Sequence, residues 1–186
     1  PLDVLTGGPR DAPARLRSLR DGLAWSYSLL APAEQALFRR LSIFSGGFSL
    51  DLAESIVADN GAASASLLDG IGALIDSSLL VQLEGATTPR YGMLETVREF
   101  AEETLTASGE HDVLHERHLK VLLEMAEAAN DATEGPERSV WVQRLRTEQE
   151  NLRIAIQRAL ARKQGELALR LSMELWNYWT TNDATT

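Results

Sequence analysis

The stretch from Tyr91 to Leu105 places the strongest constraint on the fold, because its hydrophobic period changes partway. It reads YGMLETVREFAEETL. Tyr91 and Met93 alternate as in a β-strand, whereas the apolar residues from Leu94 onward recur with helical spacing, as on one helix face. The stretch therefore predicts a strand that passes directly into a helix.

The segments around this switch predict a winged helix, in which helices are followed by a strand hairpin, the wing, and a further helix. Apolar stripes, caps and breakers such as Pro32 and the pair Gly46-Gly47 delimit the elements. In chain order we expect helices at 16–30, 32–44, 50–58 and 65–77, strands at 79–83 and 91–93, and a helix at 95–107. The predicted fold class is mainly α with a small two-stranded β-hairpin.

The rest of the chain has helical periodicity throughout. One helix covers Leu114, a long helix passes through Trp141, and a third follows Gly165. The long helix starts after Pro136 and is predicted to continue to Leu160 without a break. The pattern predicts stacked antiparallel helical hairpins, similar to tetratricopeptide (TPR) repeats, at the start of a solenoid whose later repeats are missing. No clean internal period is present, so the repeat class stays open.

The predicted domains are a linker at 1–14, a winged-helix domain at 15–108 and a truncated TPR-like helical-hairpin region at 109–186. The linker contains glycine and proline and shows little periodicity. The chain starts at Pro1 without a methionine and ends in a polar run. We therefore expect it to be a piece of a larger protein.

Composition excludes several classes of function. The 186 residues include no cysteine, which excludes disulfides and cysteine nucleophiles and fits a cytoplasmic location. No apolar run approaches the roughly 20 residues of a membrane-spanning helix. The phosphate-loop patterns GxxxxGK(S/T) and GxGxxG are also missing from the sequence, so the chain is predicted to hold no nucleotide cofactor by such a loop of its own. No catalytic arrangement follows from residue spacing, and an enzyme is not predicted.

Charge provides a test of DNA binding. Segment 46–109 carries ten acidic and two basic side chains, a net charge of −8. The predicted helix at 65–77, the one that would enter a DNA groove, contains Asp69 and Asp76 but no lysine or arginine. Groove-reading helices need donors to base edges, and contacts with phosphate supply most of the affinity. The charge pattern argues against direct DNA binding and favours contacts with protein.

The three histidines, His111, His115 and His118, fall on one predicted helix. The sequence HERH at 115–118 resembles half of a zinc motif, but its histidines are closer together than the four-residue spacing of HExxH. His111 and His115 do have the spacing to chelate a metal. The favoured interpretation is that all three are surface side chains of a helix, with His118 partly packed, and no metal site is predicted.

The four tryptophans, Trp25, Trp141, Trp176 and Trp179, lie on or beside the apolar stripes of their helices. Aromatic rings can serve as platforms on which bases stack. A role in the core or between helices is favoured over that one. Trp176 and Trp179 are expected to be exposed only if their packing partners lie outside this chain.

Two blocks of sequence carry a family resemblance. The first comprises SLRDGLAWSYSLLAPAEQALFRRLSIFSGGFSLDLAESI, SLLVQLEG and RYGMLETVREFAEETL. It resembles the segment that follows the nucleotide-binding module in bacterial STAND-type signalling ATPases, which include large LuxR-type and antibiotic-regulatory transcription factors. The second block, WVQRLRTEQENLRIAIQRAL followed by GELALRLSMELWNYW, resembles the helices that lead into the TPR-like sensor arrays of those proteins.

The same layout is similar to the winged-helix domain of plant resistance proteins and apoptosome scaffolds. In those proteins a methionine-histidine-aspartate motif follows the wing, and its histidine contacts the β-phosphate of the nucleotide. Met93 matches the methionine, Leu94 takes the place of the histidine, and Glu95 matches the aspartate. Arg98 continues the pattern. The resemblance implies that these four residues lie at an interface that depends on nucleotide state.

A structural interpretation of the same residues is favoured over the interface. Met93 and Leu94 would then fill the core under the wing, while Glu95 starts the next helix. Leu94 has no group that could donate a hydrogen bond to phosphate, so direct sensing by this side chain is not expected.

The resulting hypothesis is a noncatalytic regulatory segment. The resemblance implies an upstream nucleotide-binding domain that binds ATP or ADP, downstream helical repeats that sense an unknown inducer, and a winged helix that couples them by protein contacts. The alternative is a DNA-binding winged-helix transcription factor domain with a helical dimerisation tail. A third, weaker class is a fragment of an enzyme.

Overall fold

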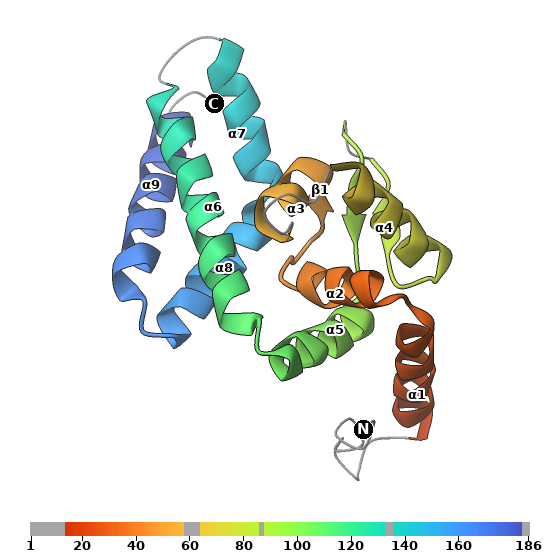
Figure 1. The fold of residues 1–186 in the computed structure, drawn as a ribbon. Coiled ribbons are helices and arrows are strands. Elements are labelled where there is room, and N and C mark those ends of the chain that lie inside the picture. Colours follow the sequence, from red (N-terminus) through yellow and green to blue (C-terminus); the bar gives the residue numbers. More distant parts are fainter. Residues whose placement is uncertain (1–13, 58–63, 86–87, 133–135, 184–186) are drawn as a thin grey trace.

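The computed structural model describes residues 14–57, 64–85, 88–132 and 136–183. The predicted linker 1–14 lies outside these residues except for Ala14. The described chain is mainly helical with a small sheet (Figure 1). Its elements are α1 (Ala14–Leu29), α2 (Pro32–Leu41), β1 (Phe48–Ser49), α3 (Leu50–Val57), α4 (Ser64–Asp76), β2 (Val81–Leu83), β3 (Arg90–Gly92), α5 (Glu95–Ser108), α6 (His111–Asp131), α7 (Pro136–Thr147), α8 (Gln149–Ala161) and α9 (Gly165–Asp183).

Helices α2 to α5 and the sheet form the predicted winged helix. Pro32 begins α2, and the Glu34 side chain caps its first turn by accepting a hydrogen bond from the Ala31 N–H at 2.8 Å. Phe38 on the buried face of α2 lies 6.3 Å, centroid to centroid, from Phe100 on α5. Aromatic packing of this kind fixes α2 against α5. The mainly α fold class is confirmed.

The sheet has three antiparallel strands in the order β1-β3-β2, one strand more than predicted. Tyr91 on β3 pairs with Phe48 on β1 and with Gln82 on β2. The strand β1 is only two residues long, too short to show an alternating pattern in the sequence. It depends on Gly47, whose φ is +91° and where a Cβ atom would lie 2.9 Å from the carbonyl oxygen of Tyr91.

Helices α6 to α9 pack beside the winged helix, and α6 contacts both α8 and α9 (Figure 1). The prediction of one continuous helix up to Leu160 is wrong, because the chain breaks between α7 and α8 at Glu148. The Glu148 backbone leaves helical geometry, with φ −95° and ψ 12°, while its side chain pairs with Arg90 of the wing. A tertiary contact therefore accounts for a break that apolar periodicity does not reveal.

One continuous apolar core extends from the winged helix into the hairpins. Three of its fully buried side chains are Ile43 in the loop after α2, Leu105 on α5 and Leu122 on α6. Burying a leucine or isoleucine side chain stabilises a fold by about 1.5–3 kcal/mol. The two regions are thus joined by hydrophobic packing, while the predicted boundary at 108/109 stays a prediction. Within the described residues, no helix is both long and apolar enough to cross a membrane.

Candidate functional site: the wing exit and the charged junction

Residues 93–98 join the wing to α5. Glu95 begins α5 as predicted, and the Leu94 carbonyl accepts a hydrogen bond from the Arg98 N–H at 2.9 Å. Met93 packs against the core as expected, but the Leu94 side chain is 61% exposed. The prediction that Leu94 fills the core is wrong, because the extended backbone at the N-terminal cap of α5 turns this side chain outward. The nucleotide-state interface at Met93, Leu94, Glu95 and Arg98 stays a prediction.

Arg98 binds two carboxylates of its own helix. It donates to both oxygens of Glu95, at 3.1 and 2.6 Å, and to Glu102 at 3.4 Å. The hydrogen bond from Arg98 lowers the pKa of Glu95, and the same bond raises the pKa of Arg98. Since Glu95 is exposed, the pair contributes little to folding, but it orients the guanidinium along α5.

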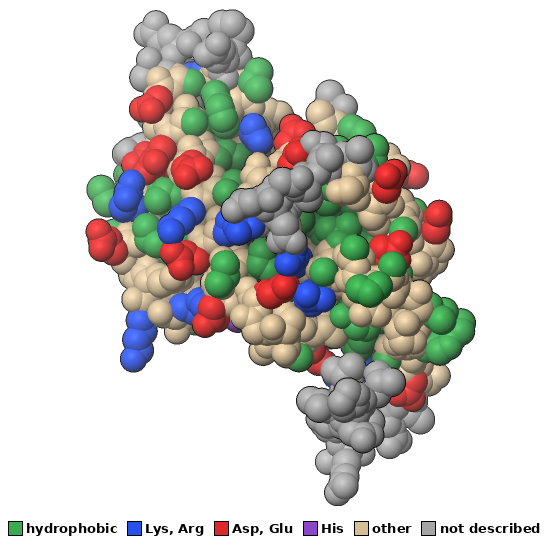
Figure 2. All heavy atoms as spheres, viewed as in Figure 1, with side chains coloured by type: hydrophobic (Ala, Val, Ile, Leu, Met, Phe, Trp, Pro, Cys, Tyr) green, Lys and Arg blue, Asp and Glu red, His purple; other side chains and the backbone are tan. Residues whose placement is uncertain are grey.

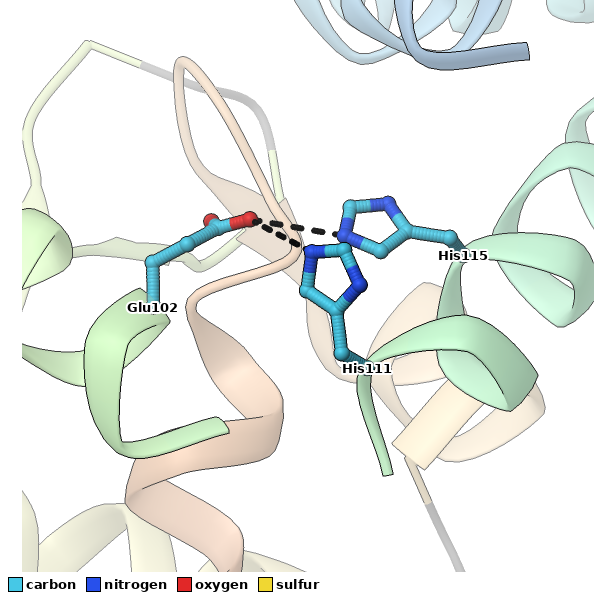
Figure 3. Close-up of side chains that lie close together, drawn as sticks. All are labelled: Glu102, His111 and His115. Atoms are coloured by element: carbon cyan, nitrogen blue, oxygen red, sulfur yellow. Dashed lines mark ion pairs between the residues drawn. The ribbon is translucent and has the colours of Figure 1, made fainter. Parts of the chain in front are cut away.

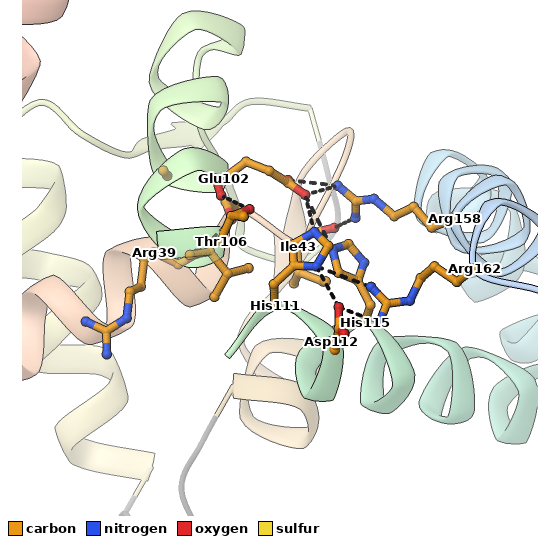
Figure 4. Close-up of polar contacts among 12 residues, drawn as sticks. Arg39, Ile43, Glu102, Thr106, His111, Asp112, His115, Arg158 and Arg162 are labelled. Carbon is orange, nitrogen blue, oxygen red and sulfur yellow. Dashed lines mark hydrogen bonds and ion pairs between the residues drawn. The ribbon is translucent and has the colours of Figure 1, made fainter. Parts of the chain in front are cut away.

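Glu102 extends this chain of charges from α5 to the helical hairpins. Both of its carboxylate oxygens accept hydrogen bonds from Arg158 on α8, at 3.1 and 2.8 Å. Its Oε1 also lies 3.4 Å from Nε2 of His115 and 3.7 Å from Nε2 of His111, both on α6 (Figure 3). Arg158 donates a further bond to the Ile43 carbonyl at 2.7 Å (Figure 4). The network therefore joins three helices and the loop that follows α2.

Burial and charge fix the protonation of this network. Burial raises the pKa of Glu102, but His115 and the positive charges of Arg158 and Arg98 outweigh it and hold the pKa below its usual value. Burial lowers the pKa of His115, and the charge of Arg158 lowers it further. At neutral pH Glu102 is thus ionised and His115 is uncharged.

A second polar cluster, which we call the buried lock, fixes the wing to α8. Arg90 of β3 forms an ion pair with Glu148, and the two side chains are only 7% and 4% exposed. Asn151 donates to Glu148 at 2.6 Å and to the Gly47 carbonyl at 2.9 Å. Arg90 donates to the same carbonyl at 3.0 Å. Each buried charge therefore has hydrogen-bond partners, and these compensate the cost of removing the ion pair from water.

Further ion pairs hold the N-terminal helices against α5 and α6. Arg39 and Arg40 of α2 both donate hydrogen bonds to the carboxylate of Glu110, in the loop between α5 and α6, at 3.0 to 3.1 Å. The hydrogen bond from Arg40, together with that from Arg39, lowers the pKa of Glu110 to about 2. Arg20 on α1 pairs with Glu103 on α5. The positive charges of this region are used to hold its own helices together.

The surface of α4 is the face that would meet a DNA groove. Its exposed side chains include Ser66, Leu68, Asp69 and Asp76. Figure 2 shows acidic but no basic side chains over α4, at the right of the view. A helix of this composition repels the phosphate backbone.

Two expectations about histidine burial are revised by the structure. His115 is 5% exposed and His118 is 1% exposed, so the prediction of a surface position is wrong for His115. Both lie on the side of α6 that faces the junction, where His118 packs edge-on against Phe44 at 5.7 Å between ring centroids. His118, which was expected to be partly packed, is completely buried.

The tryptophans differ from one another. Trp25 is 66% exposed, so the prediction of a core or interhelix position is wrong for it. Trp176 is 68% exposed, which is the exposed state expected for it if its packing partners lie outside this chain. Trp25 lies on the side of α1 opposite Tyr27, which faces the core. Trp141 is half-buried and lies 5.4 Å from the guanidinium of Arg144. The side chain of the fourth tryptophan falls outside the described part of the chain.

The arrangement of α2 to α5 with the three-stranded sheet defines the class: a winged helix-turn-helix domain joined to packed helical hairpins. Residues 30–106 match the family model described as "Winged helix-turn-helix domain". No solved structure matches the chain significantly.

Curated relatives point in the same direction. The chain is 39% identical over 178 residues, 95% of its length, to proteins of Mycobacterium tuberculosis (strain H37Rv) and Mycobacterium bovis that both bear the name "Putative HTH-type transcriptional regulator". It is 32% identical over 120 residues, 64% of its length, to an "Uncharacterized protein" of Mycobacterium tuberculosis, of which it covers 30%. The chain spans 20% of the length of the first two relatives.

The two relatives that share 39% identity with the chain are named as regulators and not as enzymes. The comparisons support a winged-helix domain of a transcription-regulatory type, which is closer to the alternative hypothesis than to coupling with an ATPase. They contain no evidence for the STAND, LuxR-type or TPR-like assignments.

Proposed function

We propose that this chain is a noncatalytic regulatory segment of a longer transcriptional regulator, in which the winged helix contacts protein and not DNA. The observation that carries the proposal is the pairing of arginine. Every arginine whose side chain is described between residues 18 and 108 binds a carboxylate of this chain: Arg20, Arg39, Arg40, Arg90 and Arg98. Because affinity for DNA comes largely from cations that meet phosphates, this region has little to offer a duplex.

The internal contacts support a coupling role. The buried lock and the Glu102 network fix the winged helix to α6 and α8. A displacement of the hairpins would therefore carry the winged helix with it, as in a rigid-body switch. The acidic surface of α4 would suit a basic partner surface.

The proposed partners are an upstream nucleotide-binding domain that binds ATP or ADP and downstream helical repeats that sense an inducer. Exposed Leu94 offers an apolar contact beside the paired Glu95 and Arg98. Together with Met93 these residues form the proposed interface with the nucleotide-binding domain. The acidic α4 is a second surface for the same domain.

Direct DNA binding is the second candidate, and the winged helix-turn-helix match is the observation that favours it. The relatives named as transcriptional regulators fit it as well. In this candidate the hairpins would serve as a dimerisation tail.

A mobility-shift titration with random duplex at low salt separates the two candidates. Nonspecific DNA-binding proteins bind with dissociation constants of about 10⁻⁴ to 10⁻⁶ M through phosphates alone. We expect no shift of the duplex at micromolar concentrations of the chain. The double variant Asp69→Lys/Asp76→Lys, which makes α4 basic, serves as the matched control and should show weak, salt-sensitive binding. Micromolar binding by the unmodified chain, lost steeply with added salt, would overturn the protein-contact proposal.

Coupling between the wing exit and nucleotide binding is tested in the longer protein by substituting two equally exposed leucines. Leu94 and Leu169 are both 61% exposed, the first at the wing exit and the second on α9. We expect Leu94→Arg to change the affinity for ATP or ADP about tenfold, a coupling energy of about 1.4 kcal/mol, and Leu169→Arg to leave it unchanged. Identical nucleotide affinity in both variants and the unmodified protein would refute a nucleotide-dependent interface at Leu94.

A further inference from the structure

We infer that Glu102, His111 and His115 form a binding site for a divalent transition metal of the Zn²⁺ class, at the junction of α5 and α6. The three donor atoms lie within 4.8 Å of one another. Figure 3 shows the carboxylate of Glu102 facing both imidazole rings. This inference does not depend on the proposed function.

The distances match the geometry that such a metal requires. Zinc binds imidazole nitrogen and carboxylate oxygen at about 2.0–2.2 Å, so the donors of a tetrahedral site lie about 3.3–3.6 Å apart. The Glu102 Oε1 is 3.4 Å from Nε2 of His115 and 3.7 Å from Nε2 of His111. His111 is only half-buried and lies in the first turn of α6, so a small adjustment of its ring closes the longer edge. Three protein donors leave a further position for water.

The buried imidazole of His115 lacks a hydrogen-bond partner in the part of the chain that the structure describes. Its side chain is buried, and within the described residues neither ring nitrogen makes a hydrogen bond. The same is true of His118, but of these two histidines only His115 has a described carboxylate, that of Glu102, next to its ring. The 3.4 Å separation between Nε2 of His115 and Oε1 of Glu102 exceeds that of a normal hydrogen bond. Leaving a buried polar group without a partner costs about 1–3 kcal/mol. A metal at the centre of the cluster gives Nε2 of His115 a strong partner.

An outer carboxylate favours metal binding by His111. Its Nδ1 lies 3.1 Å from Oδ1 of Asp112, and Arg162 pairs with that carboxylate at 2.6 Å (Figure 4). A proton shared between Nδ1 and Asp112 leaves the lone pair of Nε2 directed at Glu102, as in carboxylate–histidine–zinc triads. Arg162 also lies 3.2 Å from the same Nδ1 and competes with Asp112 for it. Asp112 is therefore a positioning residue whose contribution can be measured.

Arg158 sets the strength of the site. It orients Glu102 by bonding to both oxygens, but its positive charge repels a dication. The site is thus expected to bind metal reversibly and more weakly than closed structural zinc sites. A bound metal would tie the end of the winged helix to the first helical hairpin.

Titration of the purified 186-residue chain with Co²⁺ and Zn²⁺ after treatment with chelator tests this site. We expect one Co²⁺ per chain, with the visible absorption of four-coordinate cobalt, and full displacement by Zn²⁺. His111→Ala, at a half-buried position, should weaken Zn²⁺ binding at least about 100-fold. Glu102→Gln should do the same, and Asp112→Asn should weaken it about 10-fold.

The matched control is His118→Gln, which removes the third histidine from the same helix but outside the cluster. It should bind Zn²⁺ as the unmodified chain does, with circular dichroism confirming the fold of each variant. Equal Zn²⁺ affinity in His111→Ala and the unmodified chain would show that surface carboxylates alone hold the metal, and would overturn the site. Failure to bind either metal would overturn it too.

Discussion

The outer surface of α4 and the junction with the hairpins use charge in opposite ways. The outer surface exposes Asp69 and Asp76 without a basic neighbour on the helix. At the junction, arginines meet carboxylates, and the Arg90–Glu148 pair is almost completely buried. The winged helix therefore turns its positive charge inward to hold a second structural unit. The fold alone would suggest a DNA-binding domain, but the placement of charge favours contacts with protein.

The largest expected effect concerns the buried lock. Glu148→Ala leaves Arg90 buried without its counter-ion, so the free energy of unfolding should fall by about 3–5 kcal/mol in guanidinium denaturation. The control Asp69→Ala removes an acidic group from the outer surface of α4 and should change it by less than about 0.5 kcal/mol. Similar losses in the two variants would abolish the contrast between junction and outer surface.

The same contrast applies to two glycines. Gly47→Ala would place a Cβ atom 2.5 Å from Leu83 Cδ1 in a backbone with φ +91°, so we expect about 3 kcal/mol of destabilisation. Gly72 on α4 has open space around its Cα, and Gly72→Ala should stabilise the chain by about 0.5–1 kcal/mol. Thermal melting of both variants measures the difference, and a loss of stability in both would contradict it.

His118 should make the junction sensitive to acid. Burial, together with the positive charge of Arg158, lowers its pKa to about 3. The unfolded chain takes up a proton near pH 6.5 that the folded chain resists, so stability is full above that pH and falls as pH falls toward 3. At pH 5 the loss should be about 2 kcal/mol relative to neutral pH. Denaturant unfolding with chelator present measures it. A His118→Gln variant with the same pH slope as the unmodified chain would refute this assignment.

The smallest effect is expected at the wing exit. Leu94→Ala removes an exposed side chain and should change the free energy of unfolding of this chain by less than about 0.5 kcal/mol. Leu105→Ala, at a fully buried position on the same helix, should cost about 2–5 kcal/mol. A loss of more than about 1 kcal/mol at Leu94 would restore its interpretation as a core residue.

Local patterns predicted most of the helices. The period change after Tyr91 correctly placed the start of α5 at Glu95, and Gly109 ends that helix in a left-handed conformation. Pro32 likewise marked the start of α2. These signals act within a few residues, so no tertiary information was needed to find them.

The candidate sites were harder to predict, because their members are distant in the chain. The spacing of His111 and His115 is that of a chelating pair, but no local pattern marks Glu102, which comes next to them only because the chain turns between α5 and α6. The lock brings Arg90 to Glu148, more than fifty positions away. Nothing in either local sequence marks that pairing.

The sequence by itself determined the helices, the wing and the acidic character of α4, since propensity, periodicity and charge are properties of short segments. Only the tertiary structure decided that Leu94 is exposed, that His115 and His118 are buried, and that the helix after Pro136 breaks at Glu148. Each of these depends on which surfaces pack together, and packing is decided by long-range burial that no local period encodes.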